Sequence, residues 1–103
     1  MRILKASLAL ALLAGIETAV AQDAENGRLL SERWCTECHA IDATPTRKVT
    51  AAPDFADIAN RASTTALSLK VFLRTNHPSM PNIVIAPDQS DDLVNYILSL
   101  KRN

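Results

Sequence analysis

The stretch Cys35-Thr36-Glu37-Cys38-His39 carries the most specific information in this chain of 103 residues. Two cysteines separated by two residues and followed at once by a histidine form the C-x-x-C-H pattern of covalent haem attachment. On one turn of helix the three side chains leave the same face. The two sulfurs can then form thioethers with the two vinyl groups of one haem, while the imidazole reaches its iron. The motif therefore predicts Cys35 and Cys38 as attachment points and His39 as an axial ligand.

The N-terminus has the pattern of a secretory signal peptide. Arg2 and Lys5 precede a largely apolar stretch, residues 6–16, and Ala19-Val20-Ala21 matches an A-x-A cleavage site. The alternative is a single uncleaved membrane helix. We favour the signal peptide, because the apolar stretch is well short of the ~20 residues that cross a bilayer.

Cleavage after Ala21 divides the chain into a signal peptide, residues 1–21, and a mature part, residues 22–103. The mature 82 residues are enough for one domain. They hold 9 Lys+Arg and 10 Asp+Glu, a net charge near −1. This balance argues against nucleic-acid binding and against a polybasic membrane-binding surface. We therefore expect an exported protein with no nucleic-acid partner and no stable membrane insertion after cleavage.

Two other interpretations of the cysteine pair remain open. A C-x-x-C redox pair belongs at the start of a helix after a strand, and no such setting is visible in the sequence. A zinc site could combine Cys35, Cys38, His39 and His77, although the adjacent Cys38 and His39 make awkward tetrahedral partners. A domain this small often needs a bound group or a cross-link for stability, and one covalently bound haem c would supply it.

The mature chain is expected to be all-α, with no convincing strand. Helices are expected over residues 23–35, 54–60, 64–75 and 88–101. The first and last show the clearest one-sided apolar spacing, at i, i+3, i+4 and i+7 in the last. The side chains that form this spacing are Gly27, Leu30, Ser31 and Trp34 in the first helix and Leu93, Tyr96, Ile97 and Leu100 in the last.

The two middle helices are less sharply defined. The helix over 64–75 is apolar on more than one side, so we expect it to be well buried, with Ser63 as its N-cap. Pro53 is expected to open the short helix over 54–60. Residues 83–85 are β-branched but stand between two prolines, and we expect a buried extended loop there.

Met80 is the predicted second axial ligand, because it is the one methionine left after signal removal. It lies in His77-Pro78-Ser79-Met80-Pro81, a loop that two prolines stiffen against becoming helix. A thioether is a soft, neutral ligand that raises the potential of haem iron. The alternatives are a Met80 that only fills the core, an iron bound by His77, and an open sixth site.

These motifs and their order resemble the class I c-type cytochromes, small soluble bacterial monohaem proteins. The resemblance extends from about Gly27 to Leu100. It implies an all-α, cytochrome c-like fold of three to four helices wrapped around one covalently bound haem. In this family a small residue of the first helix crosses an aromatic residue of the last, and Gly27 and Tyr96 match these positions.

The resemblance also implies a support for the proximal histidine. Ala52-Pro53-Asp54-Phe55 resembles the family's Gly-Pro-x-Leu segment, in which the proline carbonyl accepts a hydrogen bond from that histidine. This role falls to Pro53, with Pro45 as the alternative. The chain departs from the family pattern at Ser31, where an aromatic residue is common, and at Ala52. Four basic residues are candidates for binding haem propionates, and the sequence does not choose among Arg47, Lys48, Arg61 and Arg74.

The expected function is electron transfer, not enzymatic catalysis. The resemblance implies an electron carrier that cycles between ferric and ferrous iron and docks transiently on redox protein partners. One alternative is the small cytochrome subunit of a periplasmic dehydrogenase complex. Another is a haem enzyme or gas sensor with an open sixth site.

Overall fold

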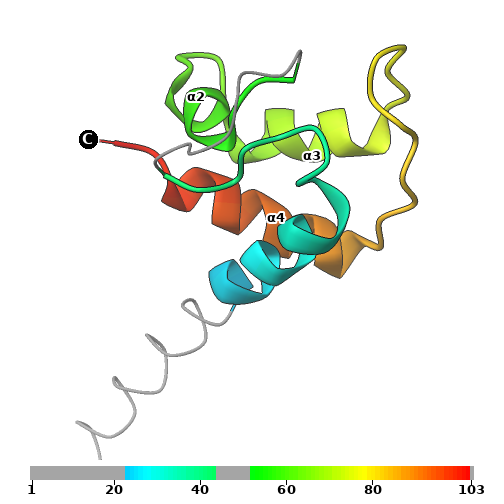
Figure 1. Cartoon of the computed structure of the whole chain (residues 1–103), viewed down its shortest axis with the longest axis horizontal. Helices are drawn as coiled ribbons and strands as arrows, with labels where there is room; N and C mark the ends of the chain where they lie inside the picture. Colours follow the sequence, from blue (N-terminus) through cyan, green and yellow to red (C-terminus); the bar gives the residue numbers. More distant parts are fainter. Residues whose placement is uncertain (1–22, 44–51, 103) are drawn as a thin grey trace, which may run out of the picture.

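The computed structural model describes residues 23–43 and 52–102, and these are helical (Figure 1). An N-terminal helix over residues 23–34 is followed by α2 (Phe55–Asn60), α3 (Ala66–Arg74) and α4 (Pro87–Ser99). Within the described ranges the one β-type pairing is an isolated bridge between His77 and Met80. The expected all-α class is confirmed. The predicted signal peptide lies outside the described residues, and none of the described helices is long and apolar enough to cross a membrane.

Helix α4 is the element against which α2 and α3 pack. Three side chains of its expected stripe, Leu93, Tyr96 and Ile97, are each less than a tenth exposed, as is Val94. The fourth, Leu100, is half-buried and lies at the C-cap of the helix. The core that forms around this stripe contains residues from α2, α3, α4 and the segment after the N-terminal helix, namely Ile41, Phe55, Ala59, Leu69, Val94, Tyr96 and Ile97. Figure 1 shows α2 and α3 lying along one side of α4, with the N-terminal helix across it.

The N-terminal helix crosses α4 at Gly27, and the two backbones lie very close there. A Cβ built on Gly27 would lie 2.6 Å from the carbonyl carbon of Asp92 and 2.8 Å from Cβ of Tyr96. Next to this contact, the amide of Asn26 donates a hydrogen bond to the carboxylate of Asp92. Ser31, one turn further on, is fully buried and donates to the carbonyl of Gly27 at 2.7 Å. The crossing is therefore built from small residues.

Helix α3 begins two residues later than expected, and the prediction of Ser63 as its N-cap was wrong. Thr65 is the N-cap, with an extended backbone at φ −130° and ψ 165°. Its hydroxyl accepts from the amide of Ser68 at 3.0 Å, and its own amide donates to the Ser68 hydroxyl at 2.8 Å. This reciprocal capping box satisfies two backbone donors at once, which Ser63 cannot do from two residues earlier.

The expectation that α3 is well buried was also wrong. Leu69 is 8% exposed, but Leu67 is 72% and Val71 57% exposed. The reason is that α4 packs on one face of α3, whereas α2 packs on α4 and not on α3. The prediction that the loop over 83–85 is buried was wrong as well. Val84 is 92% exposed and stands between two half-buried isoleucines.

Pro53 does not open α2. The helix begins at Phe55, and Asp54 is its N-cap with an extended ψ of 147°. Pro53 therefore lies one residue before the cap, outside the hydrogen-bond ladder of the helix. Its carbonyl remains available to a side chain from another segment.

Candidate haem-binding site

The cysteine–histidine motif continues the N-terminal helix as a tight turn. The amide of Cys35 donates to the carbonyl of Ser31 at 2.9 Å, and the amide of His39 donates to the carbonyl of Cys35 at 2.8 Å. The amide of Cys38 also reaches the Cys35 carbonyl, at 3.2 Å. These i→i+3 and i→i+4 bonds keep the helical spacing through the motif, so the three predicted side chains are brought together as a group.

The two cysteines differ in their surroundings. Cys35 is half-buried and packs against the hydrophobic core, whereas Cys38 is exposed. Burial raises the pKa of the Cys35 thiol to about 11, so this group stays protonated near neutral pH. The two sulfurs are not joined in a disulfide. Both are therefore present as the thiols that thioether formation requires.

The ring of His39 is oriented by a hydrogen bond to Pro53. Nδ1 of His39 lies 2.6 Å from the carbonyl oxygen of Pro53. A carbonyl can only accept, so Nδ1 carries the proton and Nε2 is left as a lone-pair donor, which is the tautomer that binds a metal through Nε2. The ring also lies against Phe55, with centroids 5.3 Å apart and planes tilted by 49°. The alternative acceptor, Pro45, lies outside the described residues.

Backbone contacts hold the segment after His39 against the core. The amide of Phe55 donates to the carbonyl of Ala40 at 2.9 Å, and the hydroxyl of Tyr96 donates to the carbonyl of Ile41 at 2.8 Å. Burial, with a contribution from Asp42, raises the pKa of Tyr96 and keeps its hydroxyl protonated as the donor. Tyr96 was singled out for its packing on Gly27. Its hydrogen bond to Ile41 could not be predicted from the sequence, because every residue has a main-chain carbonyl that can accept.

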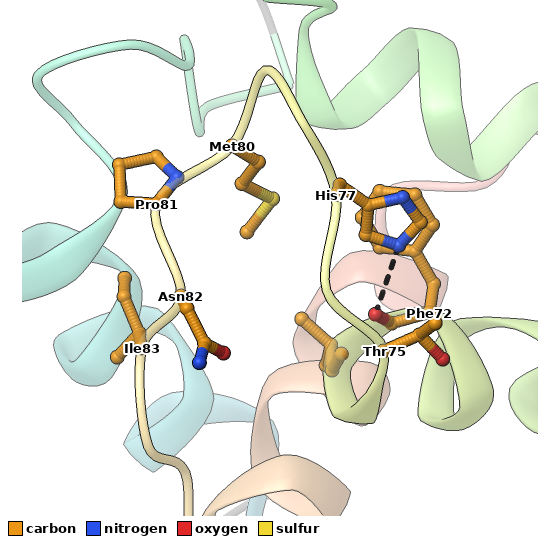
Figure 2. A pocket seen from close by; sticks show the side chains of 8 residues that line it. Phe72, Thr75, His77, Met80, Pro81, Asn82 and Ile83 are labelled. Carbon is orange, nitrogen blue, oxygen red and sulfur yellow. Dashed lines mark hydrogen bonds between the residues drawn. The ribbon is translucent and has the colours of Figure 1, made fainter.

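Met80 lies on a separate loop that joins α3 to α4. Its side chain and the residues beside it line a hollow of about 270 Å³ that is partly open to solvent. Figure 2 shows the Met80 side chain directed inward, between the two arms of the loop. The lining mixes apolar and polar side chains and consists of Phe72, Leu73, Thr75, His77, Met80, Pro81, Asn82 and Ile83.

The remaining candidates are His77 as a ligand, the zinc site and the propionate-binding residues. His77 stacks on Phe72, with ring centroids 3.7 Å apart and planes 17° from parallel. Among the described residues, no three His, Cys, Asp or Glu side chains lie close enough to hold a metal ion, so the zinc alternative has no set of ligands in place. Of the propionate candidates, Arg61 and Arg74 are exposed, and Arg47 and Lys48 lie outside the described ranges.

Comparison with known proteins gives the family. The family model for cytochrome c matches residues 24–101, which is most of the chain. The chain belongs to the cytochrome c family. A curated relative, cytochrome c-552 from Bradyrhizobium diazoefficiens, is 33% identical over 94 residues, or 91% of this chain and 90% of that protein. No solved structure matches the chain significantly. Membership makes this protein an electron-carrier cytochrome with covalently bound haem.

The donors in this cytochrome fit haem c. Two thiols and an imidazole with its Nε2 available stand on one turn, and a thioether lines a hollow on another loop. Nitrogen and soft sulfur donors suit haem iron. The fit rests on these donors and on the geometry of the turn.

Proposed function

We propose that this protein is a periplasmic electron carrier with one haem c, whose iron is bound by His39 and Met80. The observation that carries this proposal is the 2.6 Å contact between Nδ1 of His39 and the Pro53 carbonyl. It presents Nε2 as the metal donor beside two thiols on the same turn. When bound, haem c supplies a one-electron couple between ferric and ferrous iron.

Each residue has a distinct task in this proposal. Cys35 and Cys38 hold the haem through thioethers, and Pro53 fixes the ring of His39 and makes its Nε2 a better donor. Met80 supplies a soft ligand that favours the reduced state. With His39 and Met80 both holding the iron, oxygen and peroxide would have little room to bind. The protein then carries electrons and does not act on a substrate.

Electron transfer requires redox proteins as partners. The exposed Cys38 marks the side where the haem edge is nearest to solvent, and we expect redox proteins to dock there transiently. Such encounters are small and short-lived. The alternative is a subunit of a periplasmic dehydrogenase complex. Gentle purification from periplasm distinguishes the two, because a carrier elutes alone and a subunit elutes with its enzyme.

Export and haem count are tested together by intact-mass measurement of the protein purified from periplasm. The expected mass is that of residues 22–103 plus one haem. A chain that retains residues 1–21 contradicts cleavage, and a chain without the added haem contradicts covalent attachment.

The ligand assignment is tested by Met80→Ala. We expect a lower reduction potential and rapid carbon monoxide binding by the reduced protein, with haem still attached, because a thioether that stabilises ferrous iron has been removed. The matched control is Val84→Ala, which alters a 92% exposed side chain of the same connection and should leave both properties unchanged. A wild-type oxidised spectrum without the methionine-to-iron charge-transfer band means that Met80 is not the ligand.

A further inference from the structure

Phe72, at the end of α3, makes two contacts with His77 of the loop that carries Met80, beside the bond from the Thr75 hydroxyl to the Val71 carbonyl at the base of the loop. The imidazole of His77 stacks on the ring of Phe72 at 3.7 Å, with the two planes 17° from parallel. Nε2 of the same imidazole lies 3.3 Å from the Phe72 carbonyl oxygen. Figure 2 shows the His77 ring turned toward Phe72 and away from the Met80 side chain.

The position of Met80 depends on this attachment. His77 and Met80 face each other as an antiparallel bridge, with Pro78 and Ser79 forming the tip between them. Backbone pairing makes the arm that carries Met80 follow the arm that carries His77. At the base of the loop, the amide of Thr75 also donates to the Phe72 carbonyl, at 3.1 Å. The loop is thus anchored on one helix end, by a ring stack and two contacts to one carbonyl.

The same stack bears on which side chain reaches the iron. His77 is the one other histidine of the mature sequence and stands three residues from Met80. Imidazole suits iron at least as well as a thioether does. The loop carries both an imidazole and a thioether, so something must decide which of them binds the iron. Phe72 contacts His77 twice, through the ring stack and through the carbonyl oxygen near Nε2.

We propose that the stack of His77 on Phe72 is a positioning contact, which keeps the loop closed with Met80 presented and His77 withheld as a ligand. This inference rests on the proposed function, in which Met80 binds the iron. Aromatic stacks of this kind shift an equilibrium by about twofold to tenfold. Loss of the stack should therefore increase the population of the opened loop by about that factor.

The first experiment titrates oxidised holoprotein with imidazole, which binds only when Met80 has left. Apparent affinity is proportional to the opened fraction, so His77→Ala should bind imidazole about twofold to tenfold more tightly than the wild type. The charge-transfer band of Met80 should persist. Leu67→Ala is the matched control, because Leu67 lies on the same helix, is 72% exposed and is not part of the hollow. Wild-type affinity in His77→Ala overturns the proposal.

The second experiment releases His77. Phe72→Ala removes the ring stack and keeps the main-chain carbonyl, and it should weaken the Met80 band and give a spectrum of two nitrogen ligands, since the unstacked imidazole competes for the iron. Adding His77→Ala in the double variant should restore the Met80 band. Its imidazole affinity should equal that of His77→Ala alone, because the stack can be lost only once. Phe72 is 43% exposed, so its truncation leaves the core intact, which thermal unfolding checks.

The ligand set and the role of the stack can be disproved independently. A wild type that lacks the Met80 band removes the proposed ligand set itself. A wild type with the band, combined with an unweakened band in Phe72→Ala or no restoration in the double variant, leaves that ligand set standing and overturns the role of the stack alone.

Discussion

At the scale of single residues, Gly27 shows how one missing side chain sets a helix crossing. Its helical position favours alanine by about 1 kcal/mol in propensity. The backbone of Asp92 and Cβ of Tyr96 nevertheless occupy the space that an alanine methyl would need. Neither the carbonyl of Asp92 nor the Cβ of Tyr96 can swing aside as the end of a flexible chain could. Steric exclusion therefore outweighs propensity here.

Gly27→Ala should lower the free energy of unfolding by about 1–3 kcal/mol, the usual cost of overpacking. Urea denaturation of the holoprotein measures it. Arg33→Ala, on the exposed side of the same helix, serves as the control and should change stability by no more than about 0.5 kcal/mol. A gain in stability for Gly27→Ala would show that the crossing is looser than the geometry indicates.

Tyr96 also donates a hydrogen bond to the segment after His39, and its ionisation links stability to pH. Its pKa is raised in the folded state, first by burial and then by Asp42. The neutral phenol is thus favoured on folding. The resulting stability is complete below the unfolded value of about 10 and is lost as the pH rises through the higher folded value.

Tyr96→Phe should cost about 0.5–1.5 kcal/mol at pH 7, because the Ile41 carbonyl loses its donor. Above about pH 10 the wild type should lose stability more steeply than the variant, so the difference between them shrinks. Unfolding free energies across this pH range provide the measurement. Parallel curves for the two proteins would exclude Tyr96 as the titrating group.

At the scale of elements, Asn60 ties the end of α2 to the end of α4. Its amide nitrogen donates to the carbonyl of Ala56 at 2.7 Å and to that of Leu100 at 3.4 Å. Its side-chain oxygen accepts from the amide of Arg102 at 2.8 Å. One half-buried side chain therefore bonds to the backbone of α2 and to the backbone of the segment that follows α4.

Asn60→Ala should destabilise the protein by about 1–2 kcal/mol and let the amide of Arg102 exchange with solvent much faster. Asn60→Asp is the matched variant. It keeps the acceptor for Arg102 and loses the donors, so it should destabilise without losing protection at that amide. Hydrogen exchange read residue by residue separates the two. Equal exchange at Arg102 in both variants would show that the side-chain oxygen does not protect it.

The sequence predicted some elements better than others, for physical reasons. The first and last helices have one-sided apolar stripes, and both were predicted to within two residues at their described ends. Helix α3 is apolar on several faces, and periodicity could not tell that α4 covers just one of them. Its cap was misplaced because Ser63 and Thr65 are equally good capping residues, and only the partner Ser68 decides between them.

The contacts of the site also differ in how well the sequence predicts them. Cys35, Cys38 and His39 are adjacent in sequence, so one helical turn is enough to predict that they lie together. The stack of His77 on Phe72 and the ties made by Asn60 depend on how distant segments meet, and no local pattern encodes that. The contact of His39 with Pro53 was expected from family resemblance and not from the residues alone.

At the scale of the whole molecule, several large apolar side chains of the described residues are exposed. Leu67, Val71 and Val84 are each more than half exposed. A small domain buries too little surface to be very stable by itself, and a covalently attached group compensates for that. Attachment should therefore matter for stability as well as for electron transfer.

Cys35→Ser combined with Cys38→Ser should abolish the stable holoprotein and lower the unfolding midpoint sharply. Helix content by circular dichroism, followed during heating, measures this. Cys38→Ser alone keeps the half-buried Cys35 and one thioether, so it should give an intermediate midpoint. An unchanged midpoint in the double variant would show that the helices hold together without haem.

Several of the contacts that organise this molecule end on main-chain carbonyls, those of Pro53, Ile41, Phe72 and Leu100. A carbonyl is present whatever side chain its residue carries. Substitution at these positions therefore keeps the acceptor as long as the backbone path survives. During divergence, the donors Tyr96 and Asn60 are constrained in identity, while their acceptors are free to drift. Related chains can thus share these contacts without sharing the residues that accept them.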